Sequence, residues 1–125
     1  MTSDSVGEWD SQVEEIVCLN GHLIPLTQAR LSPLDYGFLY GHGLFETMRA
    51  YSGHVFRLEA HLARLGRGVQ ALGMSLDIIP DLLKAIYDTL AANHLTSARV
   101  RLTVSGGPGD PIPDITSCRE PTVLI

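Results

Sequence analysis

Residues 31–49 read LSPLDYGFLYGHGLFETMR, and this stretch decides the fold. Its first part, Leu31 to Gly43, is rich in glycine and aromatic residues and contains Pro33, which predicts an ordered loop and not a strand. From Leu44 to Tyr51 the residues predict a β-strand. One face of this strand would carry Phe45, Thr47, Arg49 and Tyr51, and the other would carry Leu44, Glu46, Met48 and Ala50.

Neither face of this predicted strand is cleanly apolar. A buried Glu46 or Arg49 needs a partner, because an unpaired charge is costly to remove from water. A strand that lines a polar cleft therefore explains the pattern better than a strand in a sandwich core does.

Shorter strands are predicted on both sides of this stretch. Asn20-Gly21, a strong hairpin signal, separates Ile16–Leu19 from His22–Pro25. Ser52-Gly53 turns the central strand into a short strand at His54–Phe56.

Two consecutive helices follow. Leucine and valine recur at helical spacing from Leu58 to Leu72, and Gly73 stands where a left-handed cap belongs. A second helix begins at Asp77 or Ile79 and closes at Asn93-His94. Its predicted inner stripe consists of Ile79, Leu83, Ile86 and Leu90.

The last strand pattern completes the predicted fold class. Ser97–Ser105 alternates, with Arg99, Arg101 and Thr103 on the face opposite Val100, Leu102 and Val104. Hairpin-connected strands with two consecutive helices predict an α+β domain, an antiparallel β-sheet with both helices packed on one face. We expect residues 1–12 to be a flexible N-terminus and residues 13–125 to form this one domain. The β-prone segment Pro121–Ile125 leaves two readings open, a truncated chain or a docked last strand.

Composition excludes several classes of function. The chain has 125 residues and a net charge of −5, and its eight arginines are scattered, so nucleic-acid binding is not expected. No apolar run approaches the ~20 residues of a membrane span. The histidines show no metal-site spacing. Cys18 and Cys118 lie far apart without a leader segment, which favours a reduced, cytoplasmic protein.

The stretch 31–49, followed by His61-Leu-Ala-Arg64-Leu65, resembles the opening of the class IV enzymes that use pyridoxal 5′-phosphate (PLP). These are branched-chain aminotransferases, D-amino-acid aminotransferases and aminodeoxychorismate lyases. The resemblance implies that Arg64 holds the cofactor phosphate, a role that suits a forked guanidinium. It also implies that Arg101 receives an acidic substrate. Tyr40, from the loop of a partner subunit, and Phe45 would line the pocket for the substrate side chain.

The same resemblance says what is missing. These enzymes need a lysine for a Schiff base with the cofactor, and the only lysine here is Lys84, inside the second predicted helix. The chain therefore resembles the N-terminal part of such an enzyme and is expected to be inactive alone. The implied parent protein is a PLP-dependent homodimer. Its own C-terminal domain would close the site, and its substrates would be an amino acid and a 2-oxo acid.

One position bears on the branch of the family. The D-amino-acid and lyase branches tend to carry an arginine just after the Arg101 strand, where this chain has Gly106. The departure favours a transaminase that acts on branched-chain amino acids with 2-oxoglutarate. Two alternatives stay open, an aminodeoxychorismate lyase on the same scaffold and a stand-alone module without catalysis.

Overall fold

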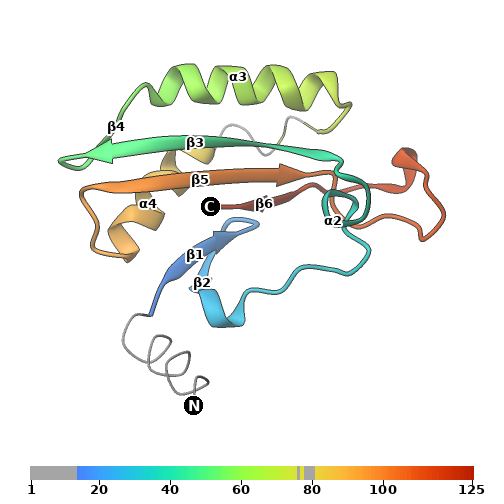
Figure 1. Ribbon diagram of the computed structural model, residues 1–125, viewed down its shortest axis with the longest axis horizontal. Coiled ribbons are helices and arrows are strands. Elements are labelled where there is room, and N and C mark those ends of the chain that lie inside the picture. Colours follow the sequence, from blue (N-terminus) through green and yellow to red (C-terminus); the bar gives the residue numbers. More distant parts are fainter. Residues whose placement is uncertain (1–13, 76, 78–80) are drawn as a thin grey trace, which may run out of the picture.

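A computed structural model describes residues 14–75, 77 and 81–125 of the chain. Its centre is a six-stranded antiparallel sheet with the order β2-β1-β6-β5-β3-β4 (Figure 1). The strands are β1 Ile16–Leu19, β2 His22–Pro25, β3 Gly43–Tyr51, β4 His54–Val55, β5 Ala98–Ser105 and β6 Thr122–Leu124. The helices are α2 Tyr36–Tyr40, α3 Leu58–Ala71 and α4 Leu82–Ala92, and the 3₁₀ turns are η1 Leu26–Gln28 and η2 Ile115–Ser117. The predicted α+β class is confirmed.

The N-terminal hairpin forms as predicted. Asn20 and Gly21 both adopt positive φ, 52° and 85°, which a two-residue hairpin turn of the primed type requires. The strand predicted near the C-terminus does not lie at an edge. β6 lies between β1 and β5, and the Cys18 N–H donates to the Ile125 carbonyl oxygen at 3.0 Å. The Asn20 side chain also accepts from the Val123 N–H at 2.9 Å, so the turn itself binds β6.

β3 and β5 are the longest strands, and they pair over eight positions, from Gly43 opposite Ser105 to Ala50 opposite Ala98. Their alternation divides the sheet into two faces. We call the buried side the covered face; it carries Glu46, Met48, Ala50, Val100, Leu102 and Val104. The opposite side, which α3 and α4 leave uncovered, is the open face; it carries Phe45, Thr47, Arg49, Tyr51, Arg99, Arg101 and Thr103.

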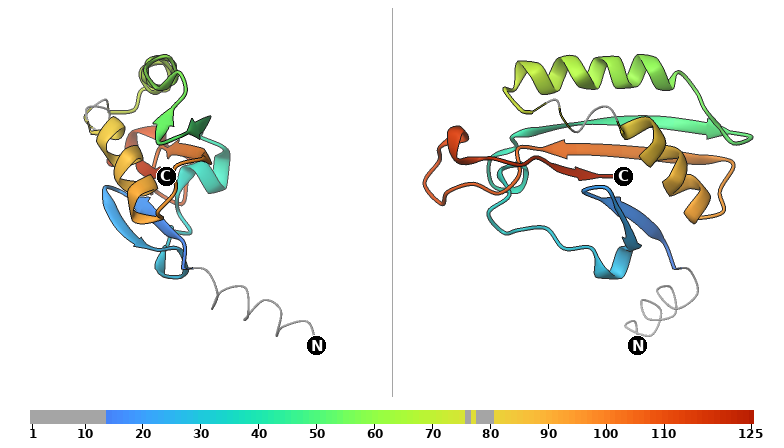
Figure 2. Two further views of the ribbon diagram at one scale, coloured as in Figure 1. Left: turned by 90° about the vertical axis from the view of Figure 1, so that its left-hand side faces the viewer. Right: turned by 180° about the vertical axis from the view of Figure 1, so that it is seen from behind.

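The two longer helices, α3 and α4, pack on the covered face (Figure 2). α3 contributes Leu58, Leu65 and Val69 to the core, and α4 contributes Leu82, Ile86 and Leu90. The predicted stripe of α4 is wrong at Leu83, which is 44% exposed, because the helix turns its neighbour Leu82 inward. The predicted stripe residue Ile79 and the predicted helix start at Ile79 lie outside the described residues. The expected helix C-cap at Gly73 is present, with φ of 73°.

The predicted loop from Leu31 to Gly43 contains a short helix, α2, so that part of the prediction is wrong. The Asp35 carboxylate caps its start by accepting from the Gly37 N–H at 2.8 Å. Gly41 ends it in the left-handed conformation, with φ of 68°. Capping at both ends lets five residues form a helical turn within a glycine-rich segment.

The expectation of a flexible terminus at residues 1–12 falls outside the described part of the chain. The helices that the structure describes include none long and apolar enough to span a membrane.

Candidate functional site

A buried carboxylate lies beneath α3. The alternation of β3 places Glu46 on the covered face, where it is 3% exposed. His61 and Arg64, one turn apart on α3, reach down to it. The Arg64 Nε donates to one oxygen of Glu46 at 2.8 Å, and Nη2 donates to the other at 2.7 Å. His61 Nδ1 lies 2.6 Å from the oxygen that also accepts from Nη2.

This arrangement is electrostatically complementary. The hydrogen bond from Arg64 lowers the pKa of Glu46, against the opposing effect of burial, and the His61 contact lowers it further. The same bond raises the pKa of Arg64. Because an ionised carboxylate can only accept, His61 donates through Nδ1 and leaves Nε2 available. The three side chains form one hydrogen-bonded cluster, the Glu46 cluster.

Arg64 keeps part of its guanidinium free. Its side chain is 66% exposed, and Glu46 uses only Nε and one edge of Nη2. Nη1 and the outer N–H of Nη2 can therefore donate to a second anion, as a bidentate phosphate contact requires. The buried carboxylate holds the guanidinium in one orientation. Arg64 thus has a donor set that fits the phosphate contact expected from the sequence resemblance.

Phe45 and Arg101 meet on the open face. The Arg101 Cζ atom lies 3.8 Å from the centre of the Phe45 ring, so the guanidinium stacks on the ring. Phe45 also lines a hollow of about 460 Å³ together with Leu31 and Phe38 from the loop region and Leu124 of β6. An apolar wall and a cation therefore lie side by side.

Tyr40 lies at the end of α2 and lines a different hollow. Its hydroxyl donates to the Pro111 carbonyl oxygen at 3.2 Å, and its ring packs edge-on against Tyr36. This hollow also contains His42 and Thr116. The structure therefore brings Phe45 and Arg101 together, and places Tyr40 and Arg64 apart from them.

The separation of Arg64 from Phe45 is set by β3. Glu46, the partner of Arg64, faces α3, whereas Phe45 faces the open side. In the described part of the chain, β4 pairs only with Ala50 and Tyr51, so the rest of β3 forms the edge of the sheet. Arg64 and Phe45 lie on the two sides of that edge.

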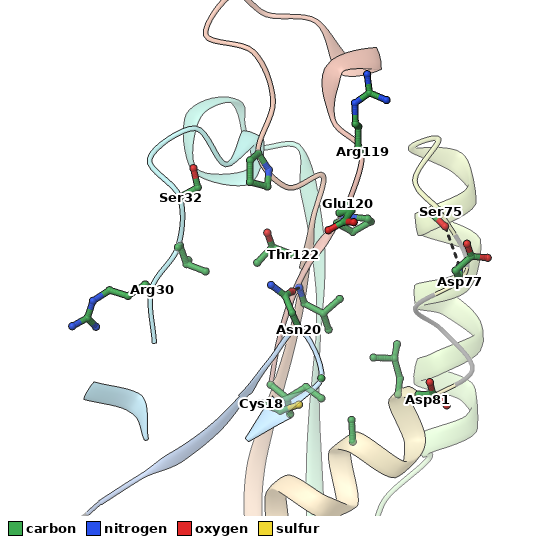
Figure 3. Close-up of a pocket in the computed structure, with 18 residues that line it drawn as sticks. Cys18, Asn20, Arg30, Ser32, Ser75, Asp77, Asp81, Arg119, Glu120 and Thr122 are labelled. Carbon is green, nitrogen blue, oxygen red and sulfur yellow. Dashed lines mark hydrogen bonds between the residues drawn. The ribbon is translucent and has the colours of Figure 1, made fainter. Parts of the chain in front are cut away.

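A third hollow, of about 730 Å³, lies between the N-terminal hairpin, the start of α4 and the segment before β6 (Figure 3). Arg30 and Arg119 are drawn with their guanidinium groups turned away from its centre. None of the predicted site residues, Tyr40, Phe45, Arg64 and Arg101, lines it.

Sequence reasoning missed the part played by three polar groups. The sequence resemblance assigns no role to His61 and gives Glu46 no role beyond lining the site. The signal was present, since an acid within a buried strand face demands a cation and the next helix carries His61 and Arg64 at i and i+3. A third missed group is the buried Tyr36 hydroxyl, which binds the loop after β5 through Asp110 and Asp114.

The comparisons with known proteins agree with this fold. The sequence pattern of the family described as amino-transferase class IV matches residues 43–125. A Methanocaldococcus jannaschii protein named as a branched-chain-amino-acid aminotransferase is 36% identical over 109 residues, 86% of this chain and 38% of that protein. The aminodeoxychorismate lyase of Bacillus subtilis is 37% identical over 112 residues, 87% of this chain and 38% of the lyase.

A solved structure has the same fold. The branched-chain amino acid aminotransferase of T.th., in complex with N-(5′-phosphopyridoxyl)-L-glutamate, superposes with a TM-score of 0.78 at 24% identity. The match covers 90% of this chain and 40% of that one. The chain thus spans about two fifths of the length of the proteins that it matches. With the family pattern over most of its length, the chain belongs to the class IV amino-transferase family.

Proposed function

We propose that this chain is the N-terminal, phosphate-holding part of a PLP-dependent aminotransferase that acts on branched-chain amino acids and 2-oxoglutarate. The observation that carries the proposal is Arg64, held by a buried carboxylate with its outer edge open to an anion. Two findings support the proposal. The chain is similar in sequence to a protein named as a branched-chain-amino-acid aminotransferase, and similar in fold to a structure that contains a phosphopyridoxyl compound.

PLP, when bound, supplies an electron sink for the bond that breaks at the substrate. The residues of this chain bind and orient. Arg64 holds the phosphate, and Glu46 keeps the guanidinium in position. His61 adds a third contact to Glu46 and offers Nε2 next to the phosphate donors.

The open face supplies the substrate contacts in this proposal. Phe45 gives an apolar wall for a branched side chain, since each buried methylene contributes about 0.8 kcal/mol. Arg101, stacked on Phe45, receives the second carboxylate of an acidic partner substrate. Tyr40 closes the pocket from a second subunit. A ligand that contacts Arg64 and Phe45 together would cross the exposed edge of β3.

The rest of the proposal concerns the complete protein. A C-terminal domain supplies the catalytic lysine, two copies form the dimer, and the enzyme works in the cytoplasm. The chain alone is inactive, because Lys84 is unsuited to the task. Its Nζ donates to Asp88 at 2.6 Å on the exposed side of α4, and this bond raises the pKa of Lys84 and keeps it protonated.

A second candidate is the aminodeoxychorismate lyase, favoured by the 37% identity to the enzyme of Bacillus subtilis. Gly106 speaks against it. A Cβ atom there would lie 2.3 Å from Cδ2 of His42, so this position has no room for an arginine while His42 keeps its place. A complete protein that carries this chain separates the two activities, by glutamate formed from leucine and 2-oxoglutarate or by release of 4-aminobenzoate. Absence of both activities would support a stand-alone module.

Phosphate binding can be tested on the chain itself. Pyridoxine 5′-phosphate carries the phosphate but no aldehyde, so it cannot react with Lys84 or the N-terminus. We expect it to bind at least about tenfold more tightly than pyridoxine. Arg64→Gln should abolish this preference, and Arg64→Lys should keep part of it. Arg67→Gln, which removes the same charge from an exposed site on α3, is the control. Equal binding of the two compounds, or loss of the preference in Arg67→Gln, would refute the role of Arg64.

A further inference from the structure

One end of β5 has a free edge on the side where β6 lies. β6 pairs with β5 only over Thr103–Ser105, and Arg99 and Arg101 come before that stretch. The Arg49 carbonyl oxygen accepts from the Phe56 N–H at 2.8 Å, so the main-chain groups of Arg49 point away from β5. Arg99, directly opposite Arg49, and Arg101, two residues further on, therefore turn their N–H and C=O groups toward the line of β6. Among the described residues, no strand pairs with β5 on that side at these positions.

The other wall of this gap is β1, and its edge is already closed. Cys18 and Ile125 exchange two main-chain hydrogen bonds, at 3.0 and 2.9 Å. Further along β1, the Ile16 N–H donates to Oδ1 of Asn93 at 2.8 Å, and Nδ2 of Asn93 donates to the Ile16 carbonyl oxygen at 2.8 Å. The Asn93 side chain thus takes the place of a strand residue beside Ile16. An extended segment in the gap would therefore pair with β5 and not with β1.

The gap forms a fourth hollow, of about 480 Å³. Its lining includes two apolar core residues on the covered side, Leu90 of α4 and Val100 of β5. It also includes Arg99 and Arg101, which belong to the open face and take part in none of the ion pairs within the described residues. Glu14, where the described part of the chain begins, lines the same hollow. The hollow therefore fits an extended segment with an apolar side chain toward α4 and acidic side chains toward the open face.

The sequence of residues 8–10 has this alternation. It reads Glu-Trp-Asp, an apolar ring between two acids. β6 runs antiparallel to both β1 and β5, so a segment that turns back from the start of β1 runs in the direction of β6. The distance from Asp10 to Glu14 along the chain reaches about 13 Å when extended, whereas neighbouring strands lie about 5 Å apart. Residues 8–10 are therefore close enough in the sequence to reach the gap.

We propose that residues 8–10 of the 125-residue chain dock in this gap as an extended segment antiparallel to β5. Glu8 lies opposite Arg101. Asp10 lies opposite Arg99, so that two acids and two arginines pair on the open face. Trp9, between the acids, turns its ring toward α4 and fills the hollow. A segment without a fold of its own binds in this way because the edge of β5 supplies the main-chain hydrogen bonds. The contact is independent of the proposed function.

Trp9 is the only tryptophan of the chain, so its fluorescence reports the docking directly. We expect emission at shorter wavelength and weaker quenching by acrylamide in the folded chain than in the chain unfolded by urea. Hydrogen exchange gives a second readout. The amides of Arg99 and Arg101 should exchange at least about tenfold more slowly in the unaltered chain than in Trp9→Ser. Equal quenching in the folded and unfolded chain, or equal exchange in the two proteins, would overturn the proposal.

Charge variants test the register of the segment. Asp10→Arg places a like charge opposite Arg99 and should speed exchange at the Arg101 amide about fivefold or more. Asp4→Arg makes the same change of charge in the same part of the sequence, outside residues 8–10, and should leave this exchange unchanged. Addition of Arg99→Asp to Asp10→Arg should restore the slow exchange. Faster exchange in Asp4→Arg, or no restoration in the double variant, would overturn the proposal.

Protein concentration distinguishes a segment that docks on its own chain from one that docks on a second copy. Docking within one chain predicts the same Trp9 emission and the same exchange at low and high concentration. Emission that moves to shorter wavelength only at high concentration would show docking between copies and would overturn the proposal.

Discussion

Glu46 and Arg64 meet edge to edge, with Nε and Nη2 of the guanidinium bonded to different oxygens of one buried carboxylate at 2.8 and 2.7 Å. A strand from the centre of the chain and the helix that follows it are joined by this pair. The pair explains how the charged side chain of Glu46 can be buried at 3% exposure, because both carboxylate oxygens accept from Arg64. It also makes a prediction about stability.

Replacement of Glu46 by alanine should lower the free energy of unfolding by about 1–3 kcal/mol, because it leaves the Nδ1 of His61 without its acceptor and opens a void. Urea denaturation of the chain measures the difference. Glu59→Ala, at an exposed position in the first turn of α3, should cost less than about 1 kcal/mol. An equal cost in the two variants would show that the Glu46 cluster does not stabilise the fold.

The same carboxylate predicts a dependence of stability on pH. The pKa of Glu46 in the folded chain is lowered from its ordinary value of 4.5. Its ionised form is therefore favoured by folding, and this contribution is present above that value and lost as the pH falls through the folded pKa. We expect stability to decrease from about pH 5 downwards and to decrease less in Glu46→Gln. Thermal unfolding between neutral and acidic pH provides the test, and identical curves for both proteins would contradict it.

Two glycines with similar backbone conformation should respond differently to alanine. Gly107 and Gly53 have φ values of 83° and 80°, but a Cβ atom at Gly107 would lie 1.8 Å from the Glu120 carbonyl oxygen, whereas at Gly53 nothing lies within 4 Å. Gly53→Ala should cost about 1–2 kcal/mol, which is the strain of the left-handed conformation alone. Gly107→Ala should cost clearly more, because the main chain before β6 must move. Similar unfolding midpoints in urea would argue against the clash.

The Tyr36 hydroxyl should stabilise the conformation of the loop after β5. It donates to the Asp110 carbonyl oxygen at 2.6 Å and accepts from the Asp114 N–H at 3.0 Å. Tyr36→Phe removes both contacts, so we expect a loss of about 1–3 kcal/mol and faster hydrogen exchange at the Asp114 amide. Tyr51→Phe, at an exposed position on the open face, should change neither quantity. Unchanged exchange at Asp114 in Tyr36→Phe would contradict this role.

Sequence patterns predicted the parts of the fold that depend on local periodicity. The alternation of β3 correctly separated Phe45 from Glu46, and Asn20-Gly21 correctly placed the first hairpin. The buried side of α4 was predicted less well. Contact with the sheet turns Leu82 inward and leaves Leu83 outside, and the sequence of the helix alone does not determine this contact. The turn of α2 depends on capping by Asp35 and Gly41 within a segment that otherwise reads as a loop.

The candidate site was only partly predictable for the same reason. That Glu46 needs a cation follows from the strand pattern, but its pairing with Arg64 depends on the path of α3 across the sheet. The contact of Arg101 with Phe45 depends on the register of β3 and β5. Neither register nor helix path can be read from one strand or helix by itself.

The position of β6 between β1 and β5 has a consequence for synthesis. The N-terminal hairpin is synthesised first, whereas β6, the strand that joins it to the sheet, is made after the other strands of the sheet. Until residues 122–125 are released, the edge of β1 that accepts β6 has no neighbour and can pair with the wrong chain. Early docking of β6 therefore removes an exposed strand edge that could pair with another chain.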